Sequence, residues 1–147
     1  MSRFTEKELA YLKSQKTGRL ATVNRHGEPQ NAPVAFTYNE ELDTIDIGGP
    51  NNAQSQKYRN IARNGLASFV VDDRTAMGGR GVEIRAHAAV VSEGGEAIYA
   101  EIAPAGRKAS YGGFSSEVIR LTPKRIITWD LSGELPGGVI QTKRNVE

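Results

Sequence analysis

The feature that most constrains the fold is a strict alternation of apolar and polar residues near the middle of the chain. Every second position there is apolar, namely Val82, Ile84, Ala86, Ala88 and Val90. Glu83, Arg85 and His87 fall between them. This period of two predicts a β-strand with one face buried and the other face in water.

Shorter apolar stretches elsewhere, separated by turn residues, predict further strands. We expect them at residues 19–23, 30–38, 44–47, 66–71, 118–122 and 125–131, with Pro123 separating the last two. Helices are expected to begin at Thr5, where Glu8 completes a capping box, after Asn52, and at residues 95–102. This order of elements favours a barrel or a sandwich over a doubly wound sheet. We find no internal repeat and no linker, so we expect one domain spanning residues 1–147.

Several side chains are assigned places in this fold. Pro33 lacks a backbone donor, so it should lie at a sheet edge or a bulge. The second helix should bury Tyr58, Ile61 and Ala62, and an Asn before it should cap it. Trp129 alternates with apolar neighbours, which favours a place in the core; its ring could instead form the wall of a site for a flat ligand.

Composition removes several classes of chemistry. The chain has no Cys, which rules out disulfides, thiolate metal sites and a Cys nucleophile. The two His have no companions at metal-ligand spacing, and no G-x-S-x-G elbow is present. We therefore predict no metal site and no catalytic side chain, so an enzyme of this sequence would depend on a cofactor. The charged N-terminus and the lack of a long apolar run favour a cytoplasmic protein without a membrane segment.

The charge distribution points to a small anionic ligand. Residues 47–71 contain no Asp or Glu, but Lys57, Arg59 and Arg63 lie among them. A local positive region of this kind suits a small anion better than nucleic acid, which usually requires a broader basic surface.

A glycine-containing turn and a helix start lie inside this positive region. Gly48 and Gly49 would let the backbone approach a ligand closely, and Asn52 follows in the same turn. Ser55 and Lys57 would add a donor and a charge to the free N–H groups of the helix start, which suits a phosphate. The alternative is a turn followed by an amphipathic helix with no ligand. The spacing matches neither a P-loop nor a G-x-G-x-x-G motif.

Two further features could contact a ligand. Arg80 opens the long strand and could reach an anion, or could be a solvated charge at a strand end. The Gly/Ser-rich stretch at residues 105–114 could be a lid or plain surface.

An ordered set of short motifs resembles the pyridoxamine 5′-phosphate oxidase-like superfamily. The set contains G-R-L-A-T-V at residues 18–23, G-E-P-Q at 27–30, S-x-K at 55–57, A-S-F-V-V at 67–71 and G-V-E-I-R-A-H-A at 81–88. The resemblance implies a split β-barrel, mainly β (α+β), with short flanking helices and an FMN-binding-like fold. It also implies a homodimer with two cofactor sites at the subunit interface. The Ser and Lys at Ser55 and Lys57 would hold the cofactor phosphate.

Departures from that pattern narrow the expected function. Members that oxidise pyridoxamine phosphate carry an Arg on the second strand, where this chain has Ala32, and an Arg-rich C-terminal motif, which is also missing. The chain looks closer to the actinobacterial branch that uses coenzyme F-420, an 8-hydroxy-5-deazaflavin with a phosphate and an oligoglutamate tail. The resemblance therefore implies hydride transfer between F-420 and a small organic substrate, with Pro33 and Val34 near the ring. The alternatives are FMN in the same fold, or a non-catalytic module that binds a flavin or a tetrapyrrole.

Overall fold

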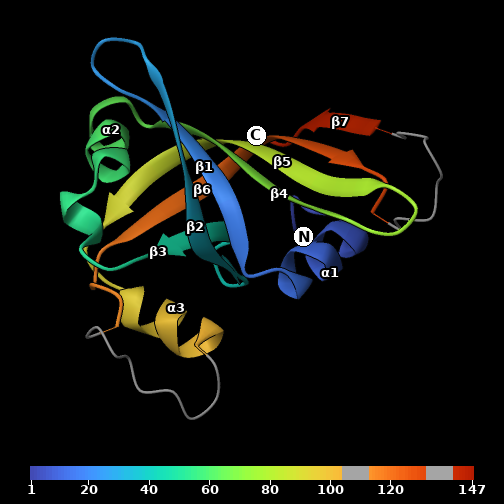
Figure 1. Ribbon diagram of the computed structural model, residues 1–147, viewed down its shortest axis with the longest axis horizontal. Coiled ribbons are helices and arrows are strands. Elements are labelled where there is room, and N and C mark those ends of the chain that lie inside the picture. Colours follow the sequence, from blue (N-terminus) through green and yellow to red (C-terminus); the bar gives the residue numbers. More distant parts are fainter. Residues whose placement is uncertain (104–112, 132–140) are drawn as a thin grey trace.

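The computed structural model describes residues 1–103, 113–131 and 141–147. Within these ranges, six antiparallel strands close into a barrel and a seventh strand is added beside one of them (Figure 1). The strands are β1 (Thr17–Val23), β2 (Pro29–Asn39), β3 (Thr44–Gly48), β4 (Leu66–Arg74), β5 (Gly79–Val91), β6 (Val118–Trp129) and β7 (Gln141–Asn145). The helices are α1 (Glu6–Ser14), α2 (Gln56–Asn64) and α3 (Gly95–Ile102), with a short 3-10 turn, η1 (Asn52–Gln54), before α2. The architecture confirms the expected mainly β split barrel with short flanking helices.

The barrel closes because β6 is long enough to pair with different strands along its length. The ring runs β3-β2-β1-β4-β5-β6, and the first part of β6 pairs with β3 to complete it. The later part of β6 pairs with β7. At the closing seam Asp46 lies opposite Arg120, whose guanidinium donates to both carboxylate oxygens at 2.9 Å. A two-point ion pair therefore fixes the register in which the barrel closes.

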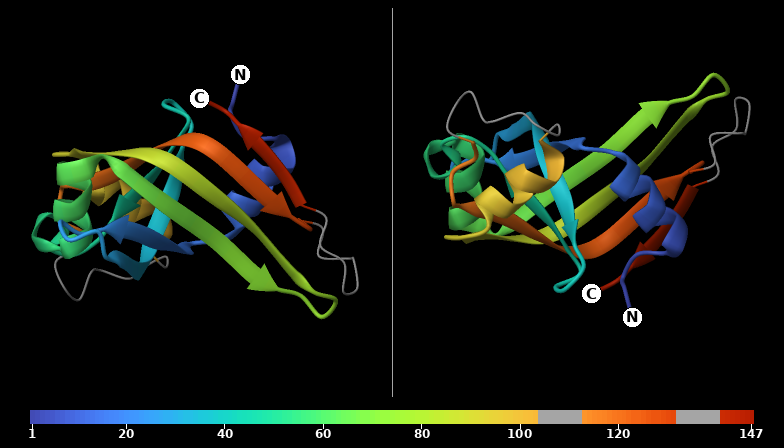
Figure 2. Two further views of the ribbon diagram at one scale, coloured as in Figure 1. Left: turned by 90° about the horizontal axis from the view of Figure 1, so that it is seen from above. Right: turned by 90° about the horizontal axis from the view of Figure 1, so that it is seen from below.

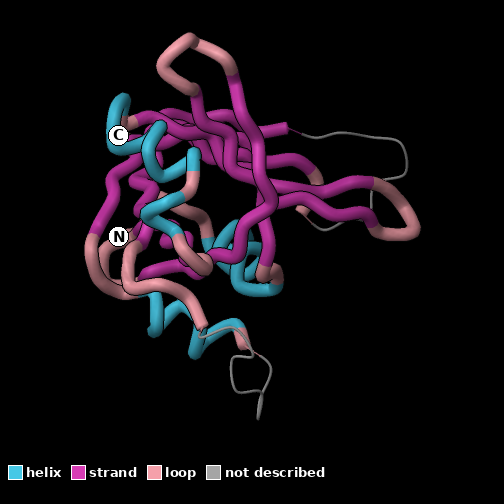
Figure 3. Tube along the Cα trace, turned by 60° about the vertical axis from the view of Figure 1, so that its left-hand side comes forward, coloured by secondary structure: helices cyan, strands magenta, loops and turns pink. Residues whose placement is uncertain are grey.

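The inner faces of the strands make one apolar core. The alternation on β5 is confirmed, since Val82, Ile84, Ala86 and Ala88 are buried whereas Arg85 and His87 are exposed. The helices lie on the outside of the strands (Figure 3). α2 and α3 lie toward one end of the barrel, and α1 and β7 toward the other (Figure 2). Residues on the α2 side of the barrel are thus separated from those on the α1 side.

Pro33 and Pro123 both lie within strands, and only Pro33 does so in the way that the sequence predicted. Pro33 pairs with Arg19 of β1, and the β3 ladder on the other side of β2 begins only at Ala35, so Pro33 lies at a local edge as predicted. The prediction that Pro123 separates two strands is wrong. β6 runs through it as one strand, and the register shifts between Arg85 and Ala86 opposite it. The bulge accommodates the missing N–H without ending the ladder.

The core assignment of Trp129 is also wrong. Ile126 and Thr128 face the barrel interior, so the residues between and after them face outward. The Trp129 ring lies over Gly81 on the outer face, where a Cβ atom at Gly81 would come within 2.4 Å of it. Ile126 and Ile127 are neighbours and both are apolar. The alternation in the sequence is therefore equally compatible with Ile126 facing the core and with Ile127, and with it Trp129, facing the core.

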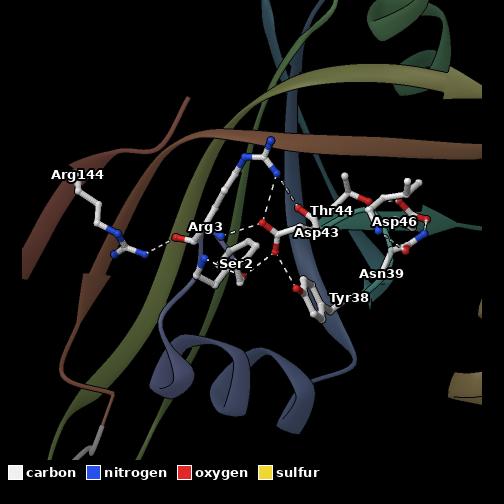
Figure 4. Close-up of polar contacts among 10 residues, drawn as sticks. Ser2, Arg3, Tyr38, Asn39, Asp43, Thr44, Asp46 and Arg144 are labelled. Carbon is white, nitrogen blue, oxygen red and sulfur yellow. Dashed lines mark hydrogen bonds and ion pairs between the residues drawn. The ribbon is translucent and has the colours of Figure 1, made fainter.

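The chain ends are tied to the barrel by buried and half-buried polar groups. Asp43, at the β2–β3 turn, accepts hydrogen bonds from the Ser2 hydroxyl, the Arg3 backbone and the Tyr38 hydroxyl at 2.6–2.8 Å (Figure 4). Arg144 of β7 donates to the Arg3 carbonyl oxygen at 2.8 Å. The segment before α1 is therefore held by β7 on one side and by the β2–β3 turn on the other.

A buried carboxylate on α1 makes the second attachment of β7. Glu8 is 1% exposed and accepts hydrogen bonds from the Thr5 backbone, the Thr128 hydroxyl and both terminal nitrogens of Arg144. The bond from the Thr5 backbone and the one that Thr5 accepts confirm the expected capping box. Burial alone would raise the pKa of Glu8, but these hydrogen bonds and the Arg144 charge lower it below its usual value. Glu8 is therefore ionised and joins α1, β6 and β7.

Candidate functional site

A pocket of about 280 Å³ lies between the first two strands and the start of α2. It is lined by Leu20 and Thr22 of β1, by Gln30, Asn31 and Ala32 of β2, and by Ser55, Gln56 and Lys57. Lys57 is the charged residue in this lining; the other seven are uncharged. The structure thus places Ser55 and Lys57 in one pocket with polar residues of the second strand.

Ser55 begins α2, so its hydroxyl is already used. Its Oγ accepts a hydrogen bond from the Tyr58 N–H at 3.3 Å and donates to the Asn52 carbonyl oxygen at 2.6 Å. The expectation that an Asn caps this helix is wrong, because Ser55 is the N-cap. Its direct contact with a phosphate therefore stays a prediction, and would require the hydroxyl to turn away from Asn52.

Lys57 is the charged group in the pocket that is free to bind an anion. Its side chain is half-buried and makes no hydrogen bond or ion pair with any residue that the structure describes. Burial lowers the pKa of its ammonium, since the charge is partly removed from water. The backbone N–H groups of Gln56 and Lys57, at the first two helical positions, have no intrahelical acceptor. An ammonium and a helix start together favour a bound anion.

A buried amide lies behind the pocket wall. Asn60 is fully buried on α2, and its Nδ2 donates to Thr22 Oγ1 at 3.0 Å and to Gln30 Oε1 at 2.7 Å. Its Oδ1 accepts from Gln56 Nε2 at 2.8 Å and from Arg63 Nη2 at 3.4 Å. Both polar atoms of Asn60 are therefore satisfied, and each one holds a residue that lines the pocket.

The other predicted residues of the turn pack against the protein itself. A Cβ atom at Gly48 would lie 2.8 Å from the Phe114 ring, so this glycine makes room for that ring. The Gly49 carbonyl oxygen accepts hydrogen bonds from the Ser115 backbone and hydroxyl. Asn52 is fully buried, and its Nδ2 donates to the Glu117 carbonyl oxygen at 3.0 Å. None of these residues lines the pocket with Lys57, so their contact with a cofactor stays a prediction.

The remaining predicted residues also lie outside the pocket lining. Val34 is buried in the core, and Pro33 is exposed at the local edge of β2. Arg80 lies beside α1, where its guanidinium donates to both carboxylate oxygens of Asp73 at 2.7 and 3.1 Å and stacks on the Tyr11 ring. Its donors are thus directed to a carboxylate and not toward Lys57. Residues 104–112, which hold most of the predicted lid, lie outside the described residues.

Two arginines of the carboxylate-free region are engaged locally. Arg59 donates to the Gln54 carbonyl oxygen and to Gln56 Oε1. Arg63 donates to the Val23 carbonyl oxygen at 2.6 Å. Both residues are exposed, and of the three basic residues in this region only Lys57 lines the pocket.

Sequence reasoning missed the polar residues opposite Lys57. Asn60 occupies the buried face of α2, where Ala62 was expected; Ala62 is exposed. The signal in the sequence that could have revealed Asn60 was its position directly before Ile61, a residue expected on the buried face of the helix. Thr22 and Gln30 are paired across β1 and β2, but this register could not be read from the sequence.

The described part of the chain offers no other obvious chemistry. It contains no group of three His, Asp or Glu side chains placed to hold a metal ion. None of its helices is both long and apolar enough to cross a membrane.

Comparison with known proteins agrees with this architecture. Residues 4–130 match the family described as pyridoxamine 5′-phosphate oxidase. A 5a,11a-dehydrotetracycline/5a,11a-dehydrooxytetracycline reductase of Streptomyces rimosus is 43% identical over 136 residues, which is 92% of this chain and 89% of that protein. Among solved structures, a conserved hypothetical protein of Mycobacterium tuberculosis is similar with a TM-score of 0.67 and 22% identity, over 88% of this chain and 87% of that one. An FAD binding protein of Mycobacterium smegmatis is similar with a TM-score of 0.57 and 22% identity, over 84% and 91%.

Proposed function

The chain belongs to the pyridoxamine 5′-phosphate oxidase family and is an oxidoreductase, and we propose that it transfers hydride between coenzyme F-420 and an unsaturated organic substrate. The single observation that carries a phosphate-bearing cofactor is the unpaired, half-buried Lys57 in a pocket at the start of α2, and the choice of F-420 over FMN follows the sequence resemblance. The direction of reaction is taken from the Streptomyces rimosus relative, which is named as a reductase.

The residues of the pocket fit the phosphate of a flavin-type cofactor. The described residues that line the pocket include no carboxylate that would repel an anion. Lys57 would neutralise the phosphate, and the free N–H groups at the start of α2 would donate to its oxygens. Ala32 places only a methyl group in the lining. This agrees with the expectation that pyridoxamine phosphate is not the substrate.

The protein's own contribution would be positioning. A reduced deazaflavin supplies a hydride, so the protein need only hold the two reacting partners close together and exclude water. The grip on the phosphate fixes one end of the cofactor relative to the barrel. We expect Pro33, one residue beyond the pocket lining on β2, to lie toward the ring, with the buried Val34 supporting it from the core. We assign no side chain as a general acid.

Cofactor titration followed by an activity assay tests this function. The purified protein is titrated with F-420 and with FMN by fluorescence, and the complex is then assayed with 5a,11a-dehydrotetracycline, the compound for which the relative is named. We expect micromolar or tighter binding of F-420 and cofactor-dependent reduction. Tighter binding of FMN than of F-420 would change the assigned cofactor to FMN and leave the assignment as a reductase unchanged. Failure of both cofactors to bind at micromolar protein would overturn the proposal.

We also propose that the protein works as a homodimer. The outer face of the barrel has a depression of about 270 Å³ where Ala21, Val70, Ile127 and Trp129 lie together. Val70 and Trp129 are only half-buried in the single chain, and a second subunit would cover them. Sedimentation at several concentrations should give twice the mass of the 147-residue chain. A monomer that binds the cofactor with full affinity would contradict an interface site.

A further inference from the structure

We propose that Gln30 is a second anion-binding side chain of the Lys57 pocket, and that the buried Asn60 sets the direction in which its amide points. This inference rests on the proposed function, because it assumes that the pocket receives the phosphate of a flavin-type cofactor. It goes beyond that function by assigning roles to two residues of this chain, one as a ligand contact and one as a positioning residue.

The orientation of the Asn60 amide is determined by its neighbours. A guanidinium can only donate hydrogen bonds, so the Asn60 atom facing Arg63 Nη2, 3.4 Å away, must be the oxygen. The Asn60 nitrogen therefore faces the opposite side, toward Thr22 Oγ1 at 3.0 Å and Gln30 Oε1 at 2.7 Å. Turning the Asn60 amide over would face its NH₂ group toward the Arg63 guanidinium and toward the Gln56 NH₂ group, whose own orientation is set because Arg59 donates to Gln56 Oε1 at 2.7 Å.

The orientation of Gln30 follows from that of Asn60. The Gln30 oxygen accepts the Asn60 N–H, so the Gln30 NH₂ group is not used by Asn60 and is directed away from it. This NH₂ group has no hydrogen-bond partner among the residues that the structure describes. Gln30 and Lys57 line the same pocket. The pocket therefore holds an ammonium and a second, neutral donor, and both are available to an anion.

The composition of the lining makes this neutral donor important. Ala32, the next residue on the same face of β2, offers no donor. Gln56, across the pocket, is already bonded to Asn60 and to Arg59. The strand side of the pocket thus offers two amides that could share the phosphate with Lys57, Gln30 and Asn31, and Gln30 is the one whose orientation is held by Asn60. A donor held in place loses little rotational freedom on binding, so its hydrogen bond contributes more to affinity.

The test compares ligands that differ only in the phosphate. For each variant, dissociation constants are measured by fluorescence for FMN and riboflavin, and for F-420 and its phosphate-free deazaflavin. The ratio of the phosphate-free to the phosphorylated constant is the phosphate advantage. We expect Gln30→Leu to lower this advantage about tenfold without changing riboflavin binding. Gln15→Leu, the same change at a glutamine outside the pocket, should leave it unchanged.

The role of Asn60 is tested in a double-mutant cycle. Asn60→Asp presents only oxygens, so Gln30 must turn over, donate to the new carboxylate and present its own oxygen to the phosphate. We expect a loss of phosphate advantage at least as large as that of Gln30→Leu. In the Gln30→Leu background, the same substitution should have little further effect. An undiminished loss in that background would show that the new charge acts directly, and would overturn the positioning role.

The outcomes separate this inference from the proposed function. Loss of the phosphate advantage in Lys57→Met, with none in Gln30→Leu, would overturn the role of Gln30 and leave the pocket as the phosphate site. No loss in either variant would overturn both proposals. Gln30 is exposed on β2, so its variants should fold normally, and thermal melting of each variant checks that they do.

Discussion

Arg144→Leu should destabilise the protein because it leaves a buried carboxylate without its partner. The Glu8 side chain is 2% exposed, whereas the Arg144 side chain is 32% exposed. Removing one partner of a buried ion pair costs about 3–5 kcal/mol, and the partial exposure of Arg144 favours the lower end, about 3 kcal/mol. For a chain of this size that corresponds to a fall in Tm of about 6–12 °C.

The pH dependence of this loss has a definite sign. In the wild-type protein the pKa of Glu8 is lowered, so its contribution to stability is present above the unfolded carboxyl pKa of about 4.3 and is lost as the pH falls through the folded value. In Arg144→Leu, burial without a partner should raise the pKa of Glu8. The destabilisation caused by the unpaired Glu8 carboxylate then decreases as the pH falls through this raised pKa, because the carboxylate becomes protonated and loses its charge. The difference in stability between the two proteins should therefore be largest near neutral pH and narrow toward pH 4.

Urea unfolding between pH 4 and 8 measures this directly. Arg125→Leu is the matched control, since Arg125 of β6 makes an exposed contact with Asn145 of β7, the strand that carries Arg144. This substitution should cost less than about 1 kcal/mol. Adding Glu8→Gln to Arg144→Leu should recover part of the loss, because the unpaired charge is gone. A pH-independent loss, or one as small as that of the control, would refute the reasoning.

Three further predictions concern the core, the barrel seam and the pocket. Gly18→Ala would bring a Cβ atom within 2.3 Å of a buried phenylalanine ring on β4. This substitution should lower the free energy of unfolding, measured with urea, by about 2 kcal/mol. Gly49→Ala is the control and should be nearly neutral, because the space around Gly49 is open. Asp46→Ala leaves Arg120 unpaired at the closing seam and should lower the free energy of unfolding by about 2–3 kcal/mol. No loss of stability would show that backbone pairing alone holds the seam. Because burial lowers the pKa of Lys57, FMN affinity should fall at a lower pH than the titration of an ordinary lysine would give. Lys57→Arg should remove this dependence in titrations over the alkaline range.

The fold could be predicted where local patterns agree with tertiary contacts. On β5, apolar residues at every second position predict both the strand and its buried face, because only one face meets the core. β6 and β7 show the limit of this approach. A bulge let β6 continue through Pro123, and that bulge depends on pairing with β5. β7 is a mostly exposed, polar strand held by Arg144, so its sequence carries no strand signal.

The site could be predicted only in part, for a similar reason. Ser55 and Lys57 stand two positions apart at a helix start, so their proximity is local and can be read from spacing. Gln30 and Asn60 meet them only because β1, β2 and α2 pack together. Gly48 and Gly49 looked like residues that admit a ligand, but the nearby ring of Phe114 and the hydroxyl of Ser115 account for the backbone there. Spacing alone does not distinguish a close approach to a ligand from a close approach to the protein itself.

A crystal structure with a flavin-type cofactor tests the central claim most directly. The measured quantity is the distance from the cofactor phosphate to the Lys57 ammonium. We predict a charge-assisted hydrogen bond of about 2.7–2.9 Å, with the phosphate at the start of α2 and the Gln30 NH₂ group directed at it. A phosphate bound elsewhere, for example beside Arg80 at the α1 side of the barrel, would contradict the account.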